Sequence, residues 1–242
     1  MPILVTHDLW KRFGGVVALA GVSFHVEPGE IVGVVGPNGA GKTTLFDIIA
    51  GLQQPTSGSV VYDGRRITGL PAHRIARLGL ARTFQIPRLF VQLDVLQNVL
   101  VGAFTSGLHG HEAHHVSEHS LERVGLADRA HVPAERLNLA DRRRLEIARV
   151  LALRPRVVLL DEAMSGLNDA ELSRMIELVA SLNRDGTTFV LVEHVMKVVM
   201  SLCARVVVID HGAVLIEDVP AVVVKDRRVI EAYLGQELDV PA

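Results

Sequence analysis

The sequence predicts an α/β fold whose core of alternating strands and helices is interrupted by a largely helical segment. Two short apolar runs, Ile31–Val35 and Val157–Glu162, have the length and composition of strands buried on both faces. A glycine-rich turn and a helical pattern follow the first run, whereas residues 93–154 carry mainly helical spacing. Strand and helix patterns resume after residue 155, so we expect one interrupted core.

The composition is that of a single large domain, or of a domain with a small lobe. The 242 residues include 49% hydrophobic residues, enough for a substantial core. A net charge of −2 and 4% aromatic residues argue against a surface for nucleic acid. The single cysteine, Cys203, excludes an internal disulfide and suits a reducing compartment.

No segment has the pattern of a membrane span or a secretory signal. The N-terminal segment carries Asp8 and lacks a long apolar stretch. The apolar region 204–226 is divided by Asp210, His211 and Pro220, and no uncharged run approaches the ~20 residues of a spanning helix. We therefore expect any work at a membrane to be done from its aqueous side.

The first part of the chain has the pattern of strands, turns and one helix. Strands are expected at Val17–Val26 and Ile31–Val35, and a helix at Thr43–Leu52. Short strands and turns are expected within residues 55–68. Pro71 suits the first position of a following helix.

The rest of the chain is expected to be helical and then to alternate. From Leu93 to Leu153 we expect helix, with a polar interruption around residues 107–119. The elements expected after the strand that ends at Glu162 are a helix at Asp169–Asn183, a strand at Thr187–His194, a helix at His194–Ala204 and a hairpin turning at His211–Gly212.

The segment Gly36–Thr43 reads GPNGAGKT and matches the phosphate-loop pattern G-x-x-x-x-G-K-[ST]. Its glycines let backbone N–H groups point at phosphate oxygens, Lys42 can reach the β- and γ-phosphates, and the Thr43 hydroxyl can bind Mg²⁺. The expected helix adds the positive end of its dipole to the same anion. A strand, this loop and a helix in succession predict a nucleotide site.

Two acids close the strand Val157–Glu162. Asp161 can hold Mg²⁺ through water, and Glu162 can polarise an attacking water. Two acids can also end a strand at the surface without any catalytic role. Beside a phosphate loop, however, the pair favours nucleotide hydrolysis.

Together with these motifs, the order and spacing of four further segments resemble the ATP-binding subunits of ABC transporters over essentially the whole chain. The segments are KRFGG with Phe13, RTFQ with Gln85, SGLN at Ser165–Asn168 and LVEH with His194. The resemblance implies that Phe13 stacks on adenine, that Gln85 contacts Mg²⁺ or water, and that His194 donates to the γ-phosphate. The full set of implied ATP and Mg²⁺ contacts is Phe13, Val17, Gly36, Pro37, Asn38, Gly39, Ala40, Gly41, Lys42, Thr43, Thr44 and Asp161, with Thr43, Gln85 and Asp161 as direct or water-mediated Mg²⁺ ligands.

The same resemblance implies a P-loop NTPase (RecA-like) core with an antiparallel β subdomain and an inserted α-helical subdomain. We expect one ABC ATPase domain over residues 1–242, with its core in 1–92 and 155–242 and its helical subdomain in 93–154. The implied partners are a second ABC ATPase subunit, two integral membrane permease subunits and, indirectly, a solute-binding protein. The implied location is peripheral, on the cytoplasmic side of the plasma (inner) membrane.

The segments ARTFQIPRLF, RRLEIAR, EHVMKVVM and EAYLG further resemble the importer subunits for branched-chain amino acids and related hydrophobic amides. Other subunits choose the solute in such transporters, so this chain should carry no direct imprint of it.

The stretch LNLAD departs from the family's signature, which reads LSGGQ or LSYGQ and contacts the γ-phosphate bound by the opposite subunit. Its four positions here are Asn138, Leu139, Ala140 and Asp141. Asn138 can still donate and cap a helix, but the Cβ of Ala140 can hinder a close approach or a positive φ. The Asp141 carboxylate repels a triphosphate unless it turns away or pairs with one of the arginines at 142–144. N-x-x-D also resembles a capping box, so we expect a stable helix with weakened phosphate contacts.

Two smaller departures, Ala163 for proline and Val195 for aspartate, remove no named catalytic group. The phosphate loop of this chain should therefore hydrolyse ATP opposite an intact signature from a partner. The reciprocal site, which uses LNLAD, should bind ATP but turn over slowly. This asymmetry favours a heterodimer over a homodimer.

Three alternatives stay open. A soluble ABC ATPase of translation or DNA repair usually has paired cassettes or long coiled-coil insertions, and an exporter ATPase is often fused to membrane spans. The segment His111–His115 reads HEAHH and matches the zinc pattern H-E-x-x-H. His109, His114 and His119 lie nearby, but a zinc site needs a long buried helix and a third ligand. The segment lies in a polar stretch rich in glycine and histidine, so a solvated loop or an exposed helix start is the plainer interpretation.

Overall fold

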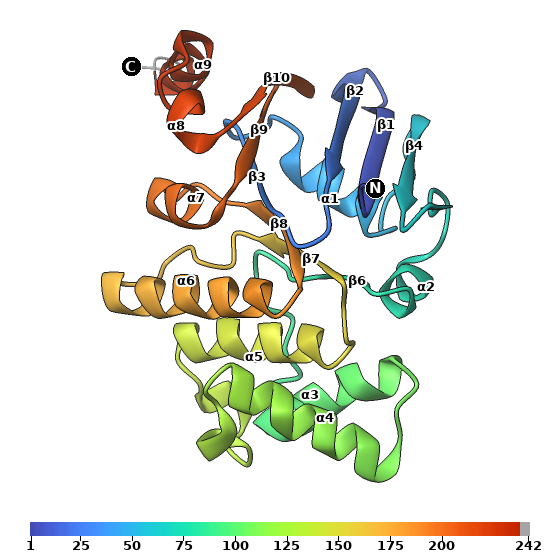
Figure 1. Cartoon of the computed structure of the whole chain (residues 1–242), viewed down its shortest axis with the longest axis vertical. Helices are drawn as coiled ribbons and strands as arrows, with labels where there is room; N and C mark the ends of the chain where they lie inside the picture. The colour runs from blue at the N-terminus through green and yellow to red at the C-terminus, as the bar shows by residue number, and fades with distance from the viewer. Residues whose placement is uncertain (238–242) are drawn as a thin grey trace. The chain divides into compact units, whose positions relative to one another are not determined.

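The computed structural model describes residues 1–237 and divides the chain into two compact units (Figure 1). The first unit contains residues 1–72 and the chain from residue 188 onward, and the second contains residues 73–187. Over the described residues, no helix combines the length and the apolar character needed to cross a lipid bilayer.

An antiparallel sheet in the first unit confirms the predicted β subdomain. Its strands run in the order β2-β1-β4-β5, and every neighbouring pair is antiparallel. Leu4 and Leu9 of β1 and Val22 of β2 are fully buried, because one face of the sheet packs inward. The bounds are β1 Leu4–Phe13, β2 Val16–Val26, β4 Ser57–Tyr62 and β5 Arg65–Arg66.

A second set of strands in the first unit runs in the order β10-β9-β3-β8. All five residues of β3 (Ile31–Val35) and of β8 (Thr188–Val192) are buried, and β3 pairs in parallel with both β8 and β9. Strands β9 (Arg205–Asp210) and β10 (Ala213–Asp218) form the predicted hairpin. The helices of this unit are α1 Lys42–Ile49, α7 Met196–Leu202, α8 Pro220–Val223 and α9 Arg227–Glu237.

The cysteine of the chain, Cys203, follows α7 and is buried. Its sulfur lies where Gly33 has no side chain: a Cβ atom on Gly33 would be 3.0 Å from the Cys203 Sγ. Burial, together with the charge of Glu193, raises the pKa of the Cys203 thiol to about 12. Cys203 is therefore a small core residue.

Strands and helices alternate in the second unit. Helix α2 (Ala72–Arg77) begins directly after Pro71, and strand β6 (Leu80–Arg82) pairs in parallel with β7 (Val157–Asp161). All residues of β7 are buried, as its apolar composition predicts. Helix α6 (Asp169–Arg184) follows β7.

Three helices of the second unit pack together (Figure 1). Helices α3 and α5 approach closely at Gly102 of α3, where a Cβ atom would lie 2.4 Å from the carbonyl oxygen of Arg149 in α5. Two single-turn 3₁₀ helices lie between α4 and α5 in the chain. The bounds are α3 Val95–Thr105, α4 Gly110–Arg123, η1 Ala127–Arg129, η2 Ala134–Arg136 and α5 Leu139–Leu151.

The polar interruption predicted around residues 107–119 is wrong. Helix α4 already begins at Gly110, and only a short turn separates it from α3. Its buried face consists largely of small residues, including Ser117 and Ser120. Each of these hydroxyls donates to a carbonyl one turn earlier at 2.7 Å, so neither is buried without a partner.

Candidate functional site

The predicted phosphate loop connects β3 to α1 in the first unit. Gly36, Gly39 and Gly41 have positive φ angles of 154°, 77° and 104°. A Cβ atom at Gly36 would lie 2.0 Å from the carbonyl oxygen of Ile209, and one at Gly41 would lie 2.4 Å from that of Ala18. The loop therefore requires glycine at both ends for steric and conformational reasons.

Lys42, Thr43 and Thr44 form the first turn of α1. The Lys42 side chain is buried, and its Nζ donates to the carbonyl oxygens of Gly36 at 2.7 Å and Pro37 at 2.8 Å. No acidic residue lies in this turn. The turn thus combines an ammonium group, two hydroxyls and the positive end of a helix dipole, which together favour an anion.

Phe13 and Val17 lie on the β1–β2 hairpin of the same unit. Both side chains are substantially exposed, and Lys11 Nζ lies 4.7 Å from the Phe13 ring centroid. Val17 precedes Ala18, whose carbonyl approaches Gly41 of the loop. The hairpin can therefore offer apolar contact to a base whose phosphates occupy the loop.

His194 follows β8 in the first unit. Because β8 runs parallel to β3, with Val192 paired to Val34, the ends that lead to His194 and to Gly36 lie at the same edge of the sheet. The imidazole is exposed there. This position allows a donor to face an anion bound at the loop.

Asp161 lies at the end of β7 in the second unit, buried beside Arg82 of β6. Arg82 Nη2 donates to Asp161 Oδ2 at 2.7 Å. Thr83 connects the two strands further, because its backbone N–H donates to the Leu159 carbonyl at 2.9 Å and its Oγ1 accepts from the Asp161 N–H at 3.2 Å. The orientation of the Asp161 backbone is thereby fixed.

Glu162 and Gln85 meet in the second unit. The Gln85 Nε2 donates to the Glu162 Oε2 at 2.7 Å. Glu162 has a φ angle of 47°, a left-handed conformation that is uncommon for residues other than glycine and recurs at functional sites. Two of the predicted catalytic side chains therefore contact each other directly.

The sequence did not predict how the segment before Gln85 is held. The backbone N–H of Phe84 donates to Glu146 Oε1 at 3.0 Å, and the Phe84 carbonyl accepts from Arg143 Nη1 at 3.2 Å. Both acceptor and donor side chains come from α5 and are buried. Arg88 stacks over the Phe84 ring with its guanidinium carbon 4.3 Å from the centroid.

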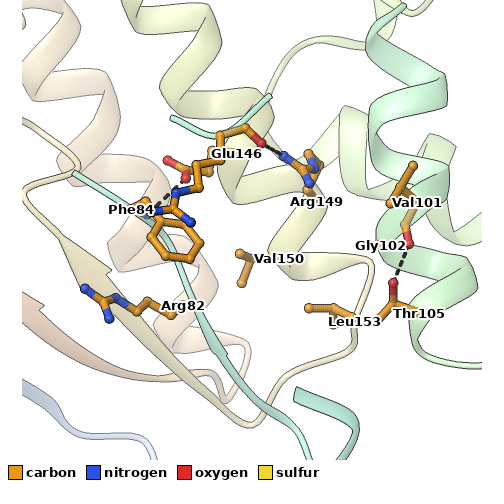
Figure 2. Close-up of a pocket in the computed structure, with 10 residues that line it drawn as sticks. Arg82, Phe84, Val101, Gly102, Thr105, Glu146, Arg149, Val150 and Leu153 are labelled. Atoms are coloured by element: carbon orange, nitrogen blue, oxygen red, sulfur yellow. Dashed lines mark hydrogen bonds between the residues drawn. The ribbon is translucent and has the colours of Figure 1, made fainter. Parts of the chain in front are cut away.

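Phe84 and Glu146 also line a cavity of about 150 Å³, together with Arg82, Arg149 and apolar residues of α3 and α5 (Figure 2). Burial raises the pKa of the Glu146 carboxyl, although the Phe84 N–H and the charges of Arg143 and Arg149 oppose this shift. Burial also lowers the pKa of Arg149, and the Glu146 charge opposes it. A buried acid thus lies among cationic groups behind Gln85.

The LNLAD segment forms the start of α5. Asn138 is the N-cap, and its side chain accepts from the Asp141 N–H at 2.8 Å. This confirms the predicted cap, but Asp141 does not complete a capping box. Its carboxylate instead accepts from Arg129 Nη1 at 2.6 Å and from Arg144 Nη2.

The Asp141 side chain is only 1% exposed. The sequence left open whether this carboxylate would face a phosphate or pair with a nearby arginine, and it pairs with Arg144 as well as with Arg129. Ala140 is also buried and lies within the helix. The backbone at this position therefore has no positive φ that a methyl group would oppose. The side chain of Leu139 is the exposed apolar group of this turn, at 44%.

The SGLN segment lies close to that turn within the second unit. A Cβ atom on Gly166, whose φ is 80°, would lie 3.1 Å from Leu139 Cδ2. Asn168 is the N-cap of α6 and forms a full capping box with Glu171. Part of this motif therefore has a plain structural role in starting a helix.

The HEAHH segment lies on the exposed start of α4. Glu112 forms an ion pair with Arg154 at 2.9 Å. Over residues 1–237, no group of three or more histidine, cysteine, aspartate or glutamate side chains is placed to hold a metal ion. The exposed helix start expected as the plainer interpretation is what the structure has.

The predicted Mg²⁺ ligands form a chemically suitable set. The Thr43 hydroxyl, the Gln85 amide oxygen and the Asp161 carboxylate are hard oxygen donors, which Mg²⁺ prefers. Asp161 is the last residue of β7, and its backbone is held by Thr83. Thr43 is exposed in the first turn of α1. The types of residue present therefore fit the ion.

Comparisons with known proteins agree on one family. A family model described as ABC transporter matches residues 19–165. The high-affinity branched-chain amino acid transport ATP-binding protein BraF of Pseudomonas aeruginosa is 42% identical, over 97% of this chain and 98% of that protein. LivG of Escherichia coli strain K12, with the same description, is 39% identical over the same shares. The lipopolysaccharide export system ATP-binding protein LptB of Acidithiobacillus ferridurans is 34% identical, over 98% of this chain and 99% of that protein.

Solved structures give the same result. A nucleotide-free ATP-binding cassette from an ABC transporter superposes with a TM-score of 0.90 at 27% identity, covering 96% of this chain and 98% of that one. An ATP-binding cassette of an ABC transporter in its ADP conformation superposes with a TM-score of 0.91 at 28% identity, covering 97% and 99%. The predicted P-loop NTPase fold is therefore confirmed.

Proposed function

The chain belongs to the ABC transporter family of ATP-binding proteins, and we propose that it powers an importer for branched-chain amino acids or related small amides. As a member it is an ATPase and a subunit of a transporter complex with membrane components. The observation that carries the importer proposal is the similarity to BraF and LivG over nearly the whole chain. We further propose that residues 93–154 act as the helical subdomain of a single ABC domain.

The chemistry assigned to the site follows from its side chains. Glu162 accepts a hydrogen bond from the lytic water, and Gln85, which donates to Glu162, orients both groups. Lys42 exchanges its loop carbonyl partners for the β- and γ-phosphate oxygens, and His194 donates to charge that develops on the γ-phosphate. Mg²⁺ held by Thr43, Gln85 and Asp161 would neutralise phosphate charge.

Glu162→Gln tests the assignment of the base. The substitution removes the carboxylate but keeps an acceptor and a side chain of the same size, so ATP should bind while kcat falls by about 100-fold or more. Bound ATP should then hold two chains together as a stable dimer, which size-exclusion chromatography with radiolabelled ATP detects. Activity within a few fold of the unmodified protein would show that Glu162 is not the base.

We propose that this chain works with a second, related ATPase rather than with a copy of itself. In LNLAD, Asn138 replaces a hydroxyl donor, and its side-chain oxygen is already used as the helix cap. Leu139 places an exposed isobutyl group where the family has glycine or tyrosine. These two residues, more than the neutralised Asp141, are the reason to expect slow turnover at the site that uses LNLAD.

A triple substitution tests this asymmetry. Changing Asn138→Ser, Leu139→Gly and Ala140→Gly while keeping Asp141 restores the family's donors and leaves the Arg129 and Arg144 ion pairs intact. The homodimer of this variant should hydrolyse ATP about 10-fold faster than the unmodified homodimer. The matched control is Asp128→Asn, at an exposed acid outside LNLAD, which should leave the rate unchanged. Equal rates for the triple variant and the unmodified chain would remove the argument for a heterodimer.

The proposed membrane partners are two permease subunits, at the cytoplasmic side of the inner membrane. The loop after Gln85 suits such a contact, because Ile86, Phe90 and Val91 expose apolar surface. An affinity tag on this chain should co-purify two polytopic membrane proteins and a second ATPase. Deletion of its gene should reduce uptake of radiolabelled leucine, isoleucine and valine, and a Lys42→Met copy should not restore it.

Export is the second candidate, and the similarity to LptB favours it. The two candidates differ in the solute-binding protein that an importer needs. Unchanged uptake of all three amino acids in the deletion strain, with loss of a lipid-export phenotype, would favour the exporter.

A further inference from the structure

We infer that Arg143 and Glu146 of α5 are positioning residues for ATP hydrolysis, because they fix the backbone immediately before Gln85. This inference rests on the proposed role of Gln85 beside Glu162. It concerns residues within the second unit only, and neither residue belongs to the phosphate loop, the strand-end acids or LNLAD.

The first step of the argument is that both polar groups of one peptide segment are held. The N–H of Phe84 donates to Glu146 Oε1 at 3.0 Å, and its carbonyl accepts from Arg143 Nη1 at 3.2 Å. Glu146 and Arg143 are one helical turn apart, so they project from the same side of α5. A carboxyl group and a guanidinium group of α5 therefore hold the backbone of a single residue.

The second step is that both side chains that hold the Phe84 backbone are buried. Glu146 is 4% and Arg143 is 6% exposed. Glu146 Oε2 and Arg143 Nε have no hydrogen-bond partner among the described residues. These side chains therefore hold the loop through their two hydrogen bonds to the Phe84 backbone. The arrangement suits a requirement for a fixed Phe84 backbone.

The third step is that the fixed backbone at residues 83 and 84 lies next to Gln85, which contacts Glu162. Thr83 is tied to β7 through Leu159 and Asp161, so residues 83 and 84 are held from two sides. Gln85 directly follows these two residues, and its side chain reaches Glu162 at 2.7 Å. Positioning of this kind contributes to rate, because a displacement of about 1 Å near a reaction can lower it roughly 100-fold.

The far end of the same loop is anchored separately. The buried Asn98 of α3 accepts from the Phe90 N–H at 2.9 Å and donates to the Phe90 carbonyl at 3.0 Å. The segment between residues 84 and 90 is therefore anchored at both ends. The anchor at Phe84 links it to α5, the helix that begins with LNLAD.

Glu146→Leu is the main test, in the transporter complex purified through a tag on this chain. Leucine fills a similar volume but cannot accept the Phe84 N–H. The kcat for ATP should fall about 10-fold while KM changes less than about twofold, since one charge-assisted hydrogen bond is lost and no ATP contact is touched. Glu146→Gln keeps an acceptor oxygen and should restore kcat to within about threefold. Glu118→Ala, at an exposed acid on α4, is the control and should change neither.

A double-mutant cycle separates positioning from a merely structural role. In a Gln85→Ala background, Glu146→Leu should lower kcat by less than about twofold, because its effect acts through Gln85. An equal loss in both backgrounds would overturn the inference. If Glu146→Leu fails to fold, Arg143→Met provides a second variant, which removes the hydrogen bond to the Phe84 carbonyl.

Hydrogen exchange of the full chain tests the hydrogen bond between the Phe84 amide and Glu146 without measuring catalysis. The Phe84 amide should exchange about 10-fold faster in Glu146→Leu and remain protected in Glu146→Gln. Unchanged exchange would overturn the inference while leaving the proposed function intact. If exchange accelerates but Gln85→Ala retains full kcat, the role of Gln85 in the proposed function fails, and the positioning role fails with it.

Discussion

Asp141→Asn should destabilise the protein strongly although it lies in a segment that looks functional. The Asp141 carboxylate is 1% exposed and accepts hydrogen bonds from two arginines, of which Arg129 is 46% and Arg144 is 27% exposed. Breaking a fully buried pair costs ~3–5 kcal/mol. Because both arginines can turn toward water, we discount this to about 2–3 kcal/mol of unfolding free energy.

For a chain of this length, that loss corresponds to a fall in Tm of about 4–12 °C. Urea unfolding followed by circular dichroism measures the free energy, and Asp128→Asn, at an exposed acid in η1, is the matched control. The control should cost less than about 0.5 kcal/mol. The difference should persist in 1 M salt, because the Asp141 carboxylate is shielded from solvent ions. Equal stability of the two variants would refute the buried ion-pair assignment.

The same substitution makes an opposite prediction for turnover. If Asp141 faced the phosphate, removing its charge would relieve repulsion and speed ATP hydrolysis by the homodimer. Because the carboxylate is buried against arginines, Asp141→Asn should leave kcat unchanged or lower it slightly. An increase of several fold would show that the side chain turns outward during the cycle.

Two further substitutions test the stability of the two units, one in each. Gly102→Ala should cost about 2–4 kcal/mol, because its Cβ would lie 2.4 Å from the Arg149 carbonyl and force α3 and α5 apart, whereas Gly15→Ala, in open space, should be nearly neutral in the same thermal melt. Arg205→Met should lower stability at pH 7 by removing the partner of Glu30. Burial raises the pKa of Glu30, but the Arg205 hydrogen bonds and charge and the Glu27 N–H outweigh it and lower the pKa overall. A depressed carboxylate pKa adds stability above its unfolded value near 4.5 that is lost as pH falls through the folded value. The difference between Arg205→Met and the unmodified protein should therefore shrink below about pH 4.5 in urea titrations at several pH values, and a constant difference would contradict the pairing.

The sequence predicted those elements whose burial appears as an apolar run. Strands β3, β7 and β8 have every residue buried, so their composition alone distinguishes them. Helix α4 was mistaken for an interruption because its buried face is built from alanine and serine, and its histidines made it look like a loop. Helix formation there depends on packing against α3 and α5, which no local pattern records.

The site shows the same division. The phosphate loop and the pair Asp161–Glu162 follow a spacing that carries their chemistry, so they could be predicted. The contacts to Phe84 join residues 59 and 62 positions apart, and Asp141 pairs with Arg129, 12 positions earlier in the chain. Such contacts depend on the tertiary arrangement of side chains. The sequence offered the arginines at 142–144 as partners for Asp141, and the structure selects Arg144, which lies one turn away.

The buried Cys203 has a practical consequence for studying how this ATPase moves. Burial raises the pKa of its thiol to about 12, and the sulfur lies close to Gly33 of β3 directly after α7, so the reactive thiolate is disfavoured. Maleimide dyes should therefore leave the native protein unlabelled. A single cysteine introduced at Ile86 or Leu139 could then carry a fluorophore without first replacing Cys203, and distance changes during the ATP cycle could be followed in an otherwise unaltered chain.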